Sequence, residues 1–185
     1  MTVKEIIVKV CKILNEKELE EKLVSNEENV NFSERENKIL NTLVDCFNFV
    51  QNEIAENYIP FKFSEEVDFG KRIDFKNLTK RIVKILEVKD ENNLNLKYDI
   101  FVTYLIAERD VKFLTYSYLP FDLSLNDEIE NYITESIYIN GIVAEYYLIS
   151  SMSTEAEIFD ERFKDCLLNF SRKNSDIKLP SRRWI

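Results

Sequence analysis

The chain has 185 residues, of which 45% are hydrophobic and 12% aromatic, enough to bury the core of a single domain. It contains no histidine, two glycines and three widely separated cysteines, which excludes a Ser–His or Cys–His nucleophile and a glycine-rich phosphate loop. The formal net charge is −9, and this argues against sequence-independent binding of nucleic acid, which needs clustered Lys and Arg. The composition therefore indicates a binding or structural protein rather than an enzyme, and no cofactor is expected.

The cysteines and the apolar runs indicate where the protein is made. No apolar run approaches the roughly 20 residues that span a bilayer, and no basic and then apolar leader opens the chain. Cys11, Cys46 and Cys166 lack C-x-x-C spacing, and each falls beside apolar residues on an expected helix. We expect a soluble, unexported protein whose cysteines are small core side chains kept reduced.

Two amphipathic helices are predicted at the start of the chain. Apolar residues recur every three or four positions over residues 3–24, which predicts the first helix. After a polar loop, Ser33 and Glu36 form an S-x-x-E capping box. An apolar stripe follows and ends before Pro60, so the second helix is expected over residues 34–58.

The middle of the chain is predicted to form strands. Between Pro60 and Pro120 the apolar period changes from 3.6 to about 2, and aromatic and β-branched residues replace Leu and Glu. We expect a small antiparallel β-rich section over about 67–118, with a turn at 90–93. Gly70 marks a tight turn or a bulge near its start.

The helical period returns after the β-rich section. Ser124 or Asn126 is the expected N-cap of a helix over about 126–152, and a second helix is expected over 154–173. These two helices should form an antiparallel hairpin, and Gly141 should mark close helix packing. The fold class is therefore α+β and mainly α, with an N-terminal helix pair, a β section, a C-terminal helical hairpin and an extended tail.

Two groups of acidic residues are candidate metal sites or acid–base pairs. The first is Glu65, Glu66 and Asp68, and the second is Asp122, Asp127 and Glu128. A solvated loop explains the first group, and the first turn of a helix, where negative charge opposes the helix dipole, explains Asp127 and Glu128. We prefer these structural interpretations, and we predict no catalytic and no metal-binding residue.

Aromatic residues gather in the β-rich section. They are Tyr98, Phe101, Tyr104, Phe113, Tyr116 and Tyr118. A stacking platform for single-stranded nucleic acid would pair such residues with a basic groove, and that basic half is weak here. Ordinary packing within the sheet is the preferred explanation, because strands favour aromatic residues.

The C-terminal tail differs in charge from the rest of the chain. From Arg172 onward there are five basic residues and one acidic residue, and the only tryptophan lies here. The candidate interaction residues are Lys178, Arg182, Arg183, Trp184 and Ile185. Arg and Trp dominate interface hot spots, so the tail is suited to dock on an acidic neighbouring subunit of the same protein, although a frayed, solubilising terminus is the alternative. We expect one domain over 1–178 and a basic, aromatic tail over 179–185.

The order of elements carries a family resemblance. A Tyr-rich strand ends in Tyr116-Ser-Tyr118-Leu-Pro120, and Phe121-Asp-Leu-Ser-Leu-Asn-Asp-Glu128 then precedes a long helix. This resembles the head-to-tail connector, or adaptor, proteins of tailed bacteriophages, the ring-forming group that includes the tail tubular protein A and gateway proteins. In that group an acidic, leucine-bearing step precedes the long helix, and Asp122-Leu123 occupies it here. The segment Pro180-Ser-Arg-Arg-Trp184 is similar to the tails of such neck proteins.

The resemblance implies a structural virion protein of the neck, between head and tail, made in the host cytoplasm. It implies a homo-oligomeric ring of twelve copies that binds the portal protein and, on its other side, tail or nozzle proteins. Such a ring continues the channel for DNA ejection. An acidic lumen would repel phosphate, so genomic DNA would pass without specific binding, and no membrane partner is implied.

Two other functions stay open at this point. A small acidic, non-viral interaction or regulatory protein would act as a monomer or dimer and face a basic partner. A metal-dependent enzyme would bind a divalent metal and lose it on Glu66→Gln and Asp68→Asn substitution. Closed high-order rings, or binding to a portal, would separate the connector from both.

Overall fold

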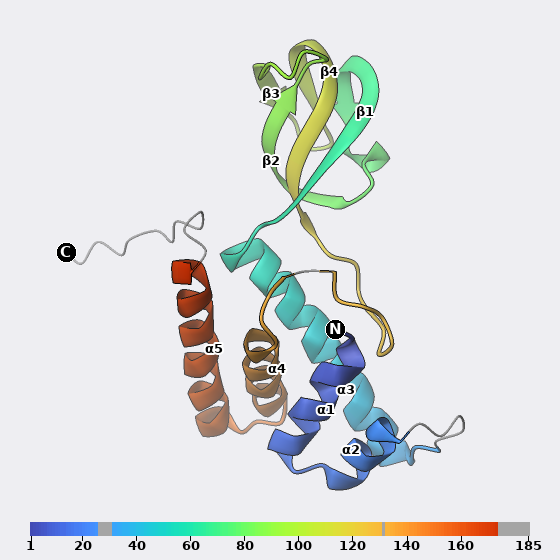
Figure 1. Cartoon of the computed structure of the whole chain (residues 1–185), viewed down its shortest axis with the longest axis vertical. Helices are drawn as coiled ribbons and strands as arrows, with labels where there is room; N and C mark the ends of the chain where they lie inside the picture. Colours follow the sequence, from blue (N-terminus) through green and yellow to red (C-terminus); the bar gives the residue numbers. More distant parts are fainter. Residues whose placement is uncertain (26–30, 131, 174–185) are drawn as a thin grey trace, which may run out of the picture. The chain divides into compact units, whose positions relative to one another are not determined.

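The computed structural model describes residues 1–25, 31–130 and 132–173 (Figure 1). The chain divides into two compact units. The helical unit comprises Met1–Gln51 and Asp122–Ile185, and the β unit comprises Asn52–Phe121. The β unit is thus one continuous insertion into a helical unit that both ends of the chain build. The α+β class expected from the sequence is confirmed; the single domain over 1–178 stays a prediction.

The helix predicted over residues 3–24 is in fact two helices, α1 (Val3–Leu14) and α2 (Lys17–Val24). Asn15 between them has a φ of 59°, in the left-handed region, and its N–H donates to the carbonyls of the last turn of α1. That conformation ends an α-helix, and asparagine tolerates it better than most residues do. The single-helix prediction was wrong because the apolar period continues on both sides of this cap.

The helix α3 (Glu34–Glu53) begins at the predicted capping box. The N–H of Glu36 donates to Ser33 Oγ (3.3 Å), and the N–H of Ser33 donates to Glu36 Oε2 (2.6 Å). The α-helix predicted to residue 58 stops at residue 53 and widens into a π-helical turn, η1 (Ile54–Tyr58). Pro60, which has no N–H to donate, follows this turn.

Four strands form one antiparallel sheet in the β unit. They are β1 (Phe61–Asp74), β2 (Arg81–Lys89), β3 (Tyr98–Ile100) and β4 (Tyr104–Leu119), and a 3-10 turn, η2 (Phe75–Asn77), follows β1. The long β4 is central, with β1 paired along one side and both β2 and β3 paired along the other. The sheet starts six residues before the predicted limit of 67, because Phe61 already pairs with Tyr118.

The β unit has its own apolar core. Its buried members are Ile73, Ile85, Val88, Leu96, Leu105, Ala107, Val111, Leu114 and Tyr116. Tyr116 is fully buried and meets the Phe63 ring edge-on at 6.1 Å, as expected for packing within the sheet. Gly70 lies at a bulge, since the pairing register of β1 on β4 shifts on both sides of it, which confirms the prediction for this glycine.

The helix predicted over 126–152 begins only at residue 135, where α4 (Glu135–Ile149) starts. The segment before it pairs with the start of the chain. Three backbone hydrogen bonds join the two, from Val3 to Asp127 (3.1 Å), from Lys4 to Leu125 (2.8 Å) and from Ile129 to Met1 (2.9 Å). These groups are satisfied without a helix, so Asp127 and Glu128 lie in a turn and a bridge, and the predicted helix start and its capping were wrong.

The helix α5 (Ser153–Lys173) has nearly the predicted bounds of 154–173 and runs antiparallel to α4. Gly141 of α4 is the point where three helices meet. A Cβ there would lie 2.7 Å from Val50 Cγ1 on α3 and 3.2 Å from the ring of Phe163 on α5. The prediction that this glycine marks close helix packing is confirmed.

Two of the three cysteines belong to the helical core. Cys11 and Cys46 are buried, and burial raises the pKa of each thiol to about 12. Cys166 is half-buried beside Asn140. No disulfide joins the cysteines, all of which lie in the described part of the chain. The prediction of core cysteines is therefore confirmed for Cys11 and Cys46.

Candidate interaction surfaces

The β3–β4 hairpin carries four exposed apolar side chains, in its turn and in the strand residues beside it, which we call the hairpin tip: Ile100, Phe101, Val102 and Ile106. Val102 is 97% exposed. The turn is closed by the N–H of Phe101, which donates to the carbonyl of Tyr104 (2.8 Å). Large apolar side chains gathered on a surface are typical of a binding site.

Aromatic and charged contacts hold one member of the hairpin tip, Phe101, in place. The Phe101 ring stacks on Tyr104, with 4.7 Å between ring centroids. The Arg72 guanidinium lies 3.9 Å from the Tyr104 centroid and donates two hydrogen bonds to Asp74 Oδ1 (2.9 and 3.1 Å). Because these contacts restrict the rotamer of Phe101 in advance, binding at this side chain would cost less conformational entropy.

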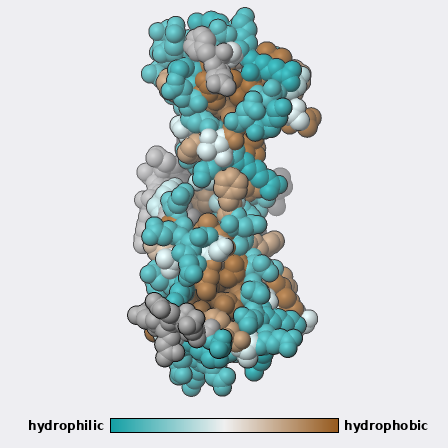
Figure 2. All heavy atoms as spheres, turned by 90° about the vertical axis from the view of Figure 1, so that its right-hand side faces the viewer, coloured by the Kyte–Doolittle hydropathy of each residue, from teal (hydrophilic) through white to brown (hydrophobic). Residues whose placement is uncertain are grey.

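A second apolar surface lies where α4 ends, in the helical unit. Leu148, Ile149 and Met152 are exposed there, and we call them the α4–α5 patch. α4 is apolar on more than one side, so packing covers only part of it. Figure 2 shows one face of the molecule, on which apolar atoms reach the surface among polar ones.

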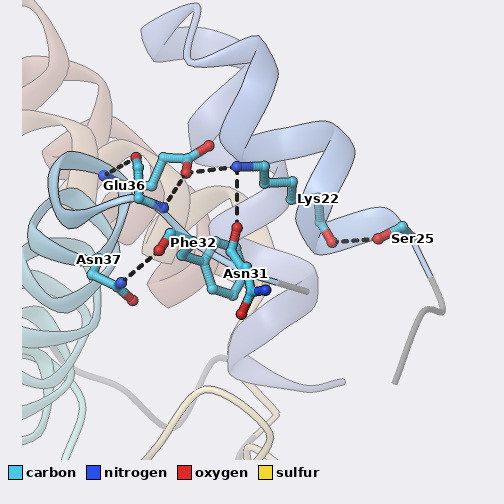
Figure 3. Close-up of polar contacts among 7 residues, drawn as sticks. Lys22, Ser25, Asn31, Phe32, Glu36 and Asn37 are labelled. Atoms are coloured by element: carbon cyan, nitrogen blue, oxygen red, sulfur yellow. Dashed lines mark hydrogen bonds and ion pairs between the residues drawn. The ribbon is translucent and has the colours of Figure 1, made fainter. Parts of the chain in front are cut away.

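A polar cluster joins α2 to the start of α3 (Figure 3). Lys22 Nζ donates to Glu36 Oε2 (2.7 Å) and to the carbonyl of Asn31 (3.3 Å). The ammonium of Lys22, followed by the hydrogen bonds from Ser33, lowers the pKa of Glu36 to about 2. The other oxygen, Glu36 Oε1, is buried with no hydrogen-bond partner among the described residues. The cluster fixes the N-terminus of α3, which is a structural task.

The first acidic group is used by the sheet rather than by a solvated loop. Glu65 accepts hydrogen bonds from Tyr116 Oη (2.6 Å) and from the N–H of Thr79 (3.2 Å), and Glu66 forms an ion pair with Lys112. Burial, and then the hydrogen bond to Glu65, raises the pKa of Tyr116. The Asp68 side chain lies outside the described part of the structure.

One member of the second acidic group, Asp127, stabilises a turn. Asp127 Oδ2 accepts from the N–H of Ser124 (2.7 Å), and the Asp127 N–H donates to the Ser124 carbonyl (3.0 Å). Over the described residues, no three Cys, Asp or Glu side chains are grouped so that they could hold a metal ion.

The predicted interaction residues of the tail, Lys178, Arg182, Arg183, Trp184 and Ile185, lie outside the described residues. Sequence reasoning missed the hairpin tip, because residues 100–104 have strand-like composition. A signal was present in the apolar run Ile100-Phe101-Val102. Successive side chains of a strand point to opposite faces, so three apolar residues in a row place at least one of them on the solvent face of a strand with one buried face.

Among the described residues, no helix is long and apolar enough to cross a membrane. The chain matches no protein-family model, and no curated protein is detectably similar to it.

Proposed function

We propose that the chain is a structural subunit that assembles head to tail into a closed ring, and that this ring is the neck of a tailed phage, joining the portal to the tail. The supporting observation is a pair of different exposed apolar surfaces on two separate units, the hairpin tip and the α4–α5 patch. A ring with a heterologous contact requires each subunit to present two different, complementary faces. In the proposal the tip of one subunit binds the patch of the next.

The charge distribution agrees with a channel for DNA. The helical unit contains 22 acidic and 14 basic residues, whereas the β unit contains 12 and 11. The acidic excess of the chain is therefore concentrated in the helical unit. A channel lined by that unit would repel phosphate and let genomic DNA pass without specific binding.

The basic and aromatic residues of the C-terminal tail are proposed to be anchors. Lys178, Arg182, Arg183 and Trp184 would attach the tail to a neighbouring subunit or to the portal, and tail or nozzle proteins would bind the other side of the ring. The proposal assigns the chain no catalytic residue and no cofactor.

Mass photometry of the full chain, alone and mixed with a candidate portal protein, tests the ring, together with negative-stain images of any large species. We expect closed rings of about twelve subunits. A persistent monomer or dimer that ignores the portal would refute the ring and favour the small acidic regulatory protein.

Two substitutions test the head-to-tail contact. Val102→Glu removes the tip and Leu148→Glu removes the patch, so each variant should stay monomeric. An equimolar mixture retains one good tip and one good patch, and it should give heterodimers but no rings. Leu94→Glu is the matched control, since Leu94 is 55% exposed in the β unit but lies outside the tip. Rings formed by Val102→Glu would refute the contact.

A further inference from the structure

We infer that the outer face of α5 is the docking site for the C-terminal tail of a second copy of the chain. This face consists of Glu157, Ile158, Glu161, Asp165 and Leu168, all of them exposed. The inference rests on the proposed function for the identity of the second copy, namely the ring neighbour. It adds the receiving surface, which the tail sequence alone does not identify.

The geometry of α5 separates this face from the core. The buried side chains of α5 are Ala156, Phe163, Leu167 and Phe170. At 100° per residue these four point about opposite to the outer face, whose members from Ile158 to Leu168 lie within roughly 100° of one another. Ile158 is 47% and Leu168 41% exposed. In Figure 1, α5 lies at the outside of the helical unit, next to α4.

The acidic residues of the outer face form a ladder of like charges. Glu157, Glu161 and Asp165 follow one another at intervals of four residues, which places their side chains side by side. None of the three has an ion-pair partner among the described residues. The neighbouring cations of α5 contact other residues, since Lys164 pairs with Asp160 (2.5 Å) and Arg162 lies over the Phe159 ring. Like charges at this spacing destabilise a helix, and a cation from outside α5 would remove that cost.

The tail has the matching chemistry. Residues 174–185 contain three basic residues and one acidic residue, together with Trp184 and aliphatic side chains. Two guanidinium groups can pair with the carboxylates of the ladder, and the apolar side chains can cover Ile158 and Leu168. Both the charge and the apolar content of the outer face therefore have a counterpart in this segment.

Length and charge order favour a second copy over the same chain. Twelve residues span at most about 40 Å, more than the roughly 30 Å length of α5, so the tail is long enough to cross to a neighbour. The exposed Arg172 follows the outer face on α5, between that face and the chain's own tail. The basic tail would have to pass the positive charge of Arg172 if it folded back on its own α5. The tail of another copy can reach Glu157 and Glu161 without passing Arg172.

Crosslinking of full-length variants distinguishes the two arrangements. One variant carries Glu161→Cys and the other Ser181→Cys, both with Cys166→Ser to remove the half-buried thiol. We expect a mixed disulfide that joins one chain of each kind under mild oxidation. Glu21→Cys, at an exposed position of α2, replaces Glu161→Cys in the control and should give none. An intrachain disulfide in a monomeric Glu161→Cys/Ser181→Cys chain, with no mixed disulfide, would overturn the inference.

Tryptophan emission provides a second measurement, because Trp184 is the only tryptophan. Docking should shift the emission to shorter wavelength as protein concentration rises. Glu161→Lys with Asp165→Lys should weaken this association roughly tenfold, and adding Arg182→Glu with Arg183→Glu should restore it. Glu21→Lys should change nothing. If the concentration dependence of the emission wavelength is the same in the parent and in all the charge-reversed variants, the inference is overturned.

Mass photometry of the same samples separates this inference from the ring itself. Rings without the mixed disulfide would refute the α5 site and leave the proposed function standing. Crosslinked dimers without rings would support the site and refute the ring.

Discussion

We expect Gly141→Ala to destabilise the helical unit. The added Cβ would lie 2.7 Å from Val50 Cγ1 and 3.2 Å from two ring carbons of Phe163. Both neighbours are at least 98% buried, and valine is stiff at χ1, so neither side chain can move aside freely. Overpacking of this kind costs roughly 1–3 kcal/mol, and replacing glycine by alanine in a helix offsets about 1 kcal/mol of it. The net loss should be about 0–2 kcal/mol.

Urea unfolding followed by far-UV circular dichroism measures this loss. Gly70→Ala is the matched control, because nothing lies within 4 Å of a Cβ there, and it should be neutral or slightly stabilising. Val50→Ala removes the atom that clashes, so combining it with Gly141→Ala should cost less than the sum of the two single losses. Strict additivity, or a Gly141→Ala protein more stable than the parent, would refute the packing argument.

Three further predictions follow from the polar and thiol groups. Lys22 lowers the pKa of Glu36 from its ordinary 4.5 to about 2. The carboxylate therefore stabilises the fold above pH 4.5 and loses this effect as the pH falls towards 2. Glu36→Gln should flatten that part of the curve of unfolding free energy against pH, measured by urea titrations. Tyr116→Phe removes the donor to Glu65 and the acceptor of the Lys80 N–H (3.1 Å), and thermal unfolding should report a loss of about 1–3 kcal/mol. With maleimide at mildly alkaline pH, Cys11 and Cys46 should react only after unfolding, as counted by mass spectrometry, since burial raises the pKa of each to about 12.

Capping and periodicity predicted the start of α3 and the span of α5 correctly, because the backbone there has no competing partner. The capping box at Ser33 and the span of α5 are local features, and the structure has both. Residues 126–134 also have helical periodicity, but the backbone groups of Asp127 and Ile129 bond to Val3 and Met1, more than 120 positions away. A window of local sequence cannot contain that contact. The break at Asn15 depends on one residue adopting a left-handed conformation, which the apolar pattern does not encode.

The candidate surfaces were harder to predict than the fold. The residues of the hairpin tip have the composition of a strand, and only the tertiary structure shows that Val102 is almost fully exposed. The four-residue spacing of Glu157, Glu161 and Asp165 on α5 is a sequence feature that ordinary helix surfaces also have. Whether these acids lie on a free face depends on which side of α5 packs against α4. The burial of Phe163 and Leu167, which identifies the packed side, is seen only in the folded unit.

The insertion of the β unit leads to a last prediction, that residues 52–121 can be replaced by a short linker. The chain leaves and re-enters the helical unit at neighbouring points, because the Asn48 side chain accepts from the Leu123 N–H (2.8 Å) and donates to the Leu123 carbonyl (3.0 Å). Gln51 is one helical turn beyond Asn48, so about six Gly and Ser residues can span the gap to Asp122.

The linker variant should keep its helical circular dichroism and unfold cooperatively in urea. It lacks the hairpin tip, so under the proposed function it should form no rings, although its α4–α5 patch is intact. Adding Asn48→Ala to it should cost about 1–2 kcal/mol through the two lost hydrogen bonds. A linker variant without cooperative unfolding would show that the helical unit depends on the insertion. One that still forms rings would show that the hairpin tip is not a ring contact, because no other copy could supply it.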